Sequence, residues 1–145
     1  MNQIIIKYII LFIIGGNSYF YVELLWRGYS HITMFFLGGL CFVLIGLINE
    51  ILVEMPLLIQ QGISSLIITT LELVFGLAFN ILLGMNIWDY SNLKFNFMGQ
   101  ISLRYSILWF FLSLPAIVFD DYLRYWIFGE EKPQYTFISY NRTRV

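Results

Sequence analysis

The sequence has little charge, one cysteine and one histidine. Charged residues make up 12% of its 145 residues and balance to a formal net charge of −1, so the chain has no basic surface of the kind that binds nucleic acid. Cys41 stands alone, which excludes an intrachain disulfide. His31 has no second histidine or cysteine cluster beside it, and we therefore expect no metal site. A Gly-x-x-x-x-Gly-Lys-Ser/Thr loop is also missing, which excludes nucleotide binding by that device, and no cofactor is expected.

Apolar residues predominate in the composition instead. Hydrophobic residues make up 59% of the chain and aromatic residues 19%, and the mean hydropathy is +0.77. Soluble domains do not reach these values, so the composition predicts a protein that crosses the membrane several times. The length allows one domain and leaves no room for a soluble catalytic or ATP-binding module.

Four apolar segments are each long enough to cross a hydrocarbon core of about 30 Å. We therefore predict an all-α fold, a four-transmembrane-helix bundle that forms one domain over residues 1–129 and is followed by a polar C-terminal tail over residues 130–145. The connection between the third and fourth helices holds tryptophan, tyrosine and phenylalanine, which flexible linkers lack, so we expect it to be ordered. The predicted spans are approximately residues 4–26, 32–53, 56–84 and 100–126.

The third predicted span carries a row of polar and small residues on one face. Their spacing of three and four residues brings them together on a helix, while large apolar side chains fill the other faces. Glu72 lies near the middle of this span, and we expect it to face a protein interior or a water-filled cavity. It could form a structural hydrogen bond between helices, or it could be a proton, cation or substrate site. The residues on this face are Ser65, Thr69, Glu72, Gly76, Asn80 and Gly84.

Charged and aromatic residues gather where the first span ends and the fourth begins. Glu23 and Arg27 are one helical turn apart and can pair. Arg104 lies about a turn inside the fourth span, where an unpaired guanidinium is costly, and we expect Asp89 or Glu23 beside it. The resulting cup could bind a zwitterion or a lipid headgroup, or it could be the latch that closes the bundle. The candidate residues of this polar cavity are Glu23, Arg27, Glu72, Asn80, Trp88, Asp89, Asn92, Gln100 and Arg104.

A second group of charges lies at the opposite ends of the spans. Glu50, Asp120, Asp121 and Arg124 could dock a cytoplasmic partner, or they could form a solvated helix end in which Asp120 and Arg124 pair one turn apart. Four spans place both termini on one side of the membrane, and the excess of basic residues on that side predicts cytoplasmic termini. The basic residues are Lys7, Arg124, Lys132, Arg142 and Arg144 on the side of the termini and Arg27, Lys94 and Arg104 on the other.

Four runs of the sequence together resemble one family. They are ELLWRGYSH at residues 23–31, GLINE at 46–50, WDYSN at 88–92 with Gly99 and Gln100, and DDYLRYW at 120–126. In these runs the chain is similar to small bacterial membrane proteins labelled putative ABC-transporter permease, type IV. The resemblance implies an integral protein of a bacterial cell membrane, of transport type, and it supplies no catalytic residues.

Three functions are compatible with these features. The first, which the resemblance favours, is a transporter-like component that binds a small or amphiphilic ligand in the polar cavity. The second is a scaffold or an oligomeric pore without a ligand, in which the polar face holds helices together. The third is an intramembrane enzyme acting on lipid, although no His pair and no Ser or Cys nucleophile stands in a recognisable setting. The expected partners are membrane lipids, with a second copy of the chain or a separate cytoplasmic protein as further candidates.

Overall fold

The computed structural model describes residues 2–52 and 55–138. The predicted end of the second span at residue 53 and the tail beyond residue 138 therefore lie outside the described residues. Within the described part, four helices are long and apolar enough to cross a bilayer, which confirms the prediction of an all-α membrane bundle. The elements are α1 (Gln3–Arg27), α2 (Ile32–Ile51), α3 (Leu57–Phe75), the π-helix η1 (Gly76–Leu82) that continues α3, β1 (Asn96–Phe97), β2 (Ile101–Ser102) and α4 (Leu103–Phe128).

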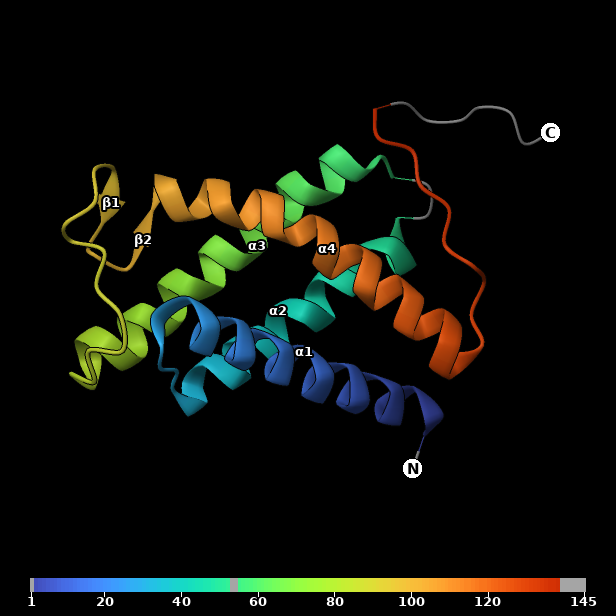
Figure 1. The fold of residues 1–145 in the computed structure, drawn as a ribbon, viewed down its shortest axis with the longest axis horizontal. Helices are drawn as coiled ribbons and strands as arrows, with labels where there is room; N and C mark the ends of the chain where they lie inside the picture. The colour runs from blue at the N-terminus through green and yellow to red at the C-terminus, as the bar shows by residue number, and fades with distance from the viewer. Residues whose placement is uncertain (1, 53–54, 139–145) are drawn as a thin grey trace.

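The four helices run up and down between two ends of the molecule (Figure 1). The start of α1, the end of α2, the start of α3 and the end of α4 meet at what we call the terminal end. The turn between α1 and α2 and the connection over residues 83–102, with the short antiparallel pair β1 and β2, form the loop end. The start of α1 and the end of α4 thus lie at the same end of the bundle, as an even number of spans requires.

Polar and glycine residues set the helix limits. The His31 ring accepts a hydrogen bond from the Thr33 amide at 3.2 Å and caps the start of α2, and the Ser102 hydroxyl accepts one from the Tyr105 amide at 3.2 Å at the start of α4. Gly28 ends α1 in the left-handed conformation, with a φ of 79°, which a residue without a Cβ adopts at little cost. The lone histidine therefore has a local structural role.

Small residues at Gly39 and Gly46 bring α2 close to its neighbours. A Cβ atom at Gly39 would come within 2.7 Å of the Phe12 carbonyl oxygen of α1. At Gly46 it would come within 2.6 Å of the Arg124 guanidinium of α4. Close backbone approach of this kind is the usual means by which helices associate in lipid, where the hydrophobic effect does not drive them together.

The polar face of α3 packs against α4. The Ser65 hydroxyl donates to the Ser106 carbonyl at 2.6 Å, Thr69 and Ser106 share a hydrogen bond of 2.8 Å, and the Gln61 amide donates to the Phe110 carbonyl at 3.0 Å. Interhelical bonds of this kind contribute about 0.6 kcal/mol each in membranes. The periodic row seen in the sequence is therefore, over its first half, a seam between two helices.

The described part of the tail, residues 130–138, folds back over the terminal end. The Leu57 amide donates to the Thr136 carbonyl at 2.7 Å, and the Leu58 amide donates to the Phe137 carbonyl at 3.4 Å. Both amides belong to the first turn of α3, where no acceptor exists within the helix itself. This part of the tail is thus a cap on α3.

Candidate functional site

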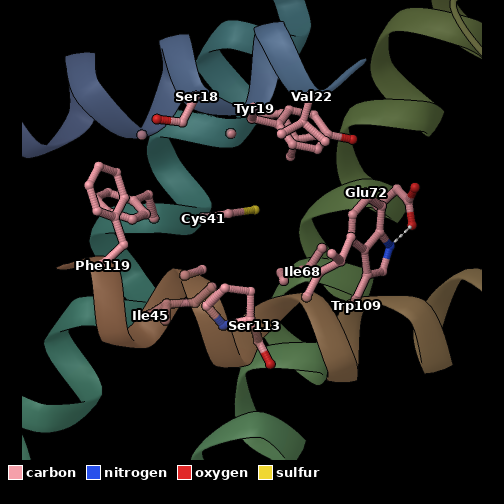
Figure 2. Close-up of a pocket in the computed structure, with 17 residues that line it drawn as sticks. Ser18, Tyr19, Val22, Cys41, Ile45, Ile68, Glu72, Trp109, Ser113 and Phe119 are labelled. Carbon is pink, nitrogen blue, oxygen red and sulfur yellow. Dashed lines mark hydrogen bonds between the residues drawn. The ribbon is translucent and has the colours of Figure 1, made fainter. Parts of the chain in front are cut away.

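All four long helices line a cavity of about 340 Å³, which we call the four-helix cavity. Figure 2 shows that Tyr19 and Val22 come from α1, Cys41 from α2, Glu72 from α3 and Trp109 from α4. Most of the other side chains on its wall are aliphatic or aromatic. The volume is at the lower end of the range of small-molecule sites, about 300–1,000 Å³.

Glu72 lies at one end of the four-helix cavity, and it is 2% exposed. One carboxylate oxygen accepts a hydrogen bond from the Tyr90 hydroxyl at 2.6 Å, and the other accepts one from the Trp109 indole at 3.1 Å. The predicted inward orientation of Glu72 is therefore confirmed. Tyr90 comes from the connection between the helices, so the acid of the cavity holds this connection against the bundle.

The Tyr90 hydroxyl stays protonated and can therefore donate its hydrogen bond to Glu72 at any physiological pH. Burial, together with the neighbouring Glu72 carboxylate, raises the pKa of the Tyr90 hydroxyl well above its ordinary value. The hydroxyl therefore keeps its proton throughout the physiological range. The Tyr90 ring also stacks on the Tyr105 ring of α4, with 4.4 Å between the ring centroids, which fixes its direction.

The other polar groups on the cavity wall already have partners. The Ser18 hydroxyl donates to the Ile14 carbonyl at 2.8 Å, and the Ser113 hydroxyl donates to the Phe110 carbonyl at 2.7 Å. The Tyr19 hydroxyl donates to Glu23 at 2.9 Å. A molecule in the cavity would therefore contact a mainly apolar wall, on which the polar groups already have hydrogen-bond partners.

Asn80 and Arg104, which we predicted beside Glu72, do not line the four-helix cavity. Asn80 lies buried beyond it toward the loop end, where its side chain donates to the Gln100 side chain at 2.8 Å and accepts from the Ile87 amide at 2.7 Å. Arg104 is exposed on α4. The spacing of residues correctly placed Asn80 on the face of Glu72, but it did not show that this part of the face lies outside the cavity.

The predicted polar cup forms only in part. Glu23 and Arg27 pair at 2.5 Å as expected, and Arg27 also donates to the Ile87 carbonyl at 3.2 Å. Arg104, however, pairs with neither predicted acid, because Glu23 is bound by Arg27 and the exposed Asp89 accepts from the Ser91 amide at 2.8 Å. The hydrogen bonds from Ser91 also lower the pKa of Asp89.

The connection between α3 and α4 closes the loop end, which confirms that it is ordered. Trp88 is buried, and its indole donates to the Gln100 carbonyl at 2.9 Å. Ile87 and Trp88 form one apolar cluster with Met34, Leu37 and Cys41 of α2. Asn92 is exposed. Trp88, Gln100 and Asn80 thus lie together, as predicted. They form hydrogen bonds with one another and with the backbone of the connection, and they do not line the four-helix cavity.

The charges at the terminal end form a network, which we call the terminal charge cluster: Lys7, Glu50, Asp120, Arg124 and Glu130. Glu50 receives hydrogen bonds from both Lys7 and Arg124. Arg124 also pairs with Asp120 at 2.7 Å, and Lys7 pairs with Glu130 at 2.5 Å. Asp120 is 0% exposed and Arg124 is 3% exposed. The pairing of Asp120 with Arg124 was predicted, but the solvated helix end was not found, because these two side chains are buried while Lys7, Glu50 and Glu130 around them are half-buried.

Asp121 lies next to this cluster with partners of its own. It accepts hydrogen bonds from the Asn49 amide at 2.7 Å and from the Tyr135 hydroxyl at 2.8 Å. Sequence reasoning missed Lys7, Asn49 and Tyr135 as parts of this region. Lys7 carried a usable signal, since a lysine inside an apolar span usually has an acid nearby. The docking of a cytoplasmic partner by Glu50, Asp120, Asp121 and Arg124 stays a prediction.

Comparison with known protein families identifies a match over most of the chain. A family model described as putative ABC-transporter type IV matches residues 10–138, a range that includes most of α1, all of the other three long helices and the capping part of the tail. Neither the curated proteins nor the solved structures contain a match. Among residues 2–52 and 55–138, no group of three or more His, Cys, Asp or Glu side chains is placed to hold a metal ion.

Proposed function

Since the chain belongs to the family described as putative ABC-transporter type IV, we propose that it acts in membrane transport by binding a small or amphiphilic molecule in the four-helix cavity. The single observation that carries this proposal is the cavity itself. A volume of about 340 Å³ lies among the four helices, with the buried carboxyl group of Glu72 at one end. A protein that served only to hold its helices together would gain stability by filling such a space.

The sole cysteine offers a direct test. Cys41 lies on the wall of the four-helix cavity, so an occupant should shield its thiol from N-ethylmaleimide. We expect the alkylation rate of the protein in lipid nanodiscs to fall about tenfold when hexanoate or hexylamine is added at about ten times its Kd. Alkylated protein is counted by mass spectrometry as a function of time.

A matched control separates shielding from general effects on the reagent. The double variant Cys41→Ser/Leu66→Cys carries its thiol on an exposed position of α3, and its alkylation should be unchanged by the same probes. If Cys41 reacts equally fast with and without both probes, the cavity is not a binding site. The scaffold or oligomeric pore would then be the better interpretation.

We also propose that the terminal end faces the cytoplasm, because the chain has more basic residues on this side. Lys132 and Lys94 are exposed at the terminal end and the loop end, respectively. With Cys41→Ser as background, Lys94→Cys should react in intact cells with a maleimide that cannot cross membranes, whereas Lys132→Cys should react only after the cells are opened. The reverse pattern would contradict the proposed orientation.

A further inference from the structure

The four-helix cavity has a mouth between α1 and α4. Val22 of α1 is 49% exposed, and Leu112 and Phe119 of α4 are each 40% exposed, yet all three also line the cavity. Residues that belong to both the wall and the outer surface mark an opening. The packing explains its position, because α1 packs chiefly on α2 and α3 chiefly on α4, whereas α1 and α4 touch at few points.

This mouth faces the hydrocarbon region of the membrane. Leu112 and Phe119 occupy the central part of α4, which runs over Leu103–Phe128, and they are seven residues apart and so on nearly the same side of the helix. Acyl chains surround the middle of a spanning helix. The molecules that meet this opening are therefore membrane lipids, while water-soluble molecules remain near the ends of the bundle.

The chemistry of the cavity wall also favours an apolar occupant. Glu72, Ser18 and Ser113 already form hydrogen bonds within the protein, so a molecule with many polar groups, such as a sugar, would lose its water shell and find few replacements. Burial of an unpaired polar group is strongly unfavourable. A saturated or isoprenoid chain has no such requirement.

The size is consistent with one chain. If a methylene group occupies about the space of a water molecule in the liquid, roughly 30 Å³, then 340 Å³ holds on the order of ten such groups. This is a substantial part of an acyl chain, and the remainder would extend through the mouth between Val22 and Leu112.

From the position of the mouth and the nature of the wall, we propose that the occupant of the four-helix cavity is the hydrocarbon chain of a membrane lipid, which enters sideways between α1 and α4. This inference rests on the proposed function and names its substrate class. The protein would admit one chain of a lipid into the bundle while the headgroup remains outside the cavity.

Trp109 can report the entry of a chain, because it lines the cavity and is only 8% exposed. In the variant Trp26→Phe/Trp126→Phe the two exposed tryptophans are removed. The protein is placed in nanodiscs of phosphatidylcholine with bromine atoms in the middle of its acyl chains, which quench tryptophan on contact. The contribution of Trp109 is obtained by subtracting the emission of the same variant with Trp109→Phe added.

We expect the emission of Trp109 to fall by about half when half of the cavities hold a brominated chain, and to saturate as the brominated fraction rises. The filling variant Ala116→Phe should abolish this quenching, since Ala116 lines the cavity. Leu66→Phe, on the exposed side of α3, should leave it unchanged. If Ala116→Phe does not fold, Cys41→Leu provides a second filling variant, because the Cys41 side chain points into the same space (Figure 2).

Two results would overturn the inference. If Trp109 is not quenched while Trp26 and Trp126 of the unaltered protein are, chains reach the surface of the bundle but not its interior. If Trp109 is quenched equally with Ala116→Phe, the contact is not in the cavity. Shielding of Cys41 by hexanoate or hexylamine in either case would show that the cavity still binds a ligand, and the proposed function would stand. Without shielding, both proposals fail.

Discussion

Replacement of Arg124 with methionine is expected to lower the free energy of unfolding by about 3–5 kcal/mol. The side chain neutralises Asp120 and contributes to the neutralisation of Glu50, and both it and Asp120 are almost fully buried. Methionine keeps the bulk of the arginine stem but leaves Asp120 as a charge without its partner. Thermal unfolding in nanodiscs, followed by tryptophan fluorescence, measures the loss.

The same substitution elsewhere on α4 provides the control for Arg124→Met. Arg104 is exposed near the start of the helix and forms no ion pair within the part of the chain that the structure describes. Arg104→Met should therefore change the unfolding free energy by no more than about 0.5 kcal/mol. Addition of Asp120→Asn to Arg124→Met should restore part of the loss, because it removes the stranded charge. Equal losses for the two arginines would show that the terminal charge cluster does not stabilise the bundle.

Replacement of Glu72 with leucine should cost about 2–4 kcal/mol. The substitution strands two buried donors, the Tyr90 hydroxyl and the Trp109 indole, and each unsatisfied donor costs about 1–3 kcal/mol. The cost in lipid tends to the lower end of this range, because the unfolded chain in the membrane also finds partners. Thermal unfolding measures the stability, and hydrogen exchange over residues 85–100 should rise as Tyr90 loses its anchor.

A double variant tests whether the loss at Glu72 comes from stranded donors. Tyr90→Phe removes one of them, so Glu72→Leu/Tyr90→Phe should be more stable than the sum of the two single changes predicts. Glu131→Leu, in the exposed part of the tail, should be close to neutral. Strict additivity of the two changes would mean that Tyr90 and Glu72 do not depend on each other.

The sequence predicted the helices and the inward direction of Glu72 because both follow from local patterns. Long apolar runs have few alternatives to a spanning helix. A carboxyl group in the middle of such a run can only be accommodated by facing protein. Spacings of three and four residues also placed Ser65, Thr69 and Asn80 on the side of Glu72, and the structure has them there.

The cavity could not be predicted because it depends on the distances between helices, which no local spacing encodes. The third span suggested a polar cavity lined by Asn80 and Arg104, but helix packing puts Asn80 under the connection and Arg104 on the outside. The apolar wall from α1, α2 and α4 had no distinctive pattern. Similarly, Lys7 signalled a missing acid, but its partners Glu50 and Glu130 are 43 and 123 residues away.

The cap on α3 has a consequence for the order of assembly. Amides in the first turn of α3 donate to carbonyl groups of Thr136 and Phe137, which the ribosome adds long after Leu57. Until those residues emerge, the nascent α3 must keep its first turn hydrated at the membrane surface. Closure of the terminal end is therefore a late event in biogenesis. The tail can cap α3 only after the ribosome has synthesised the residues that follow α4.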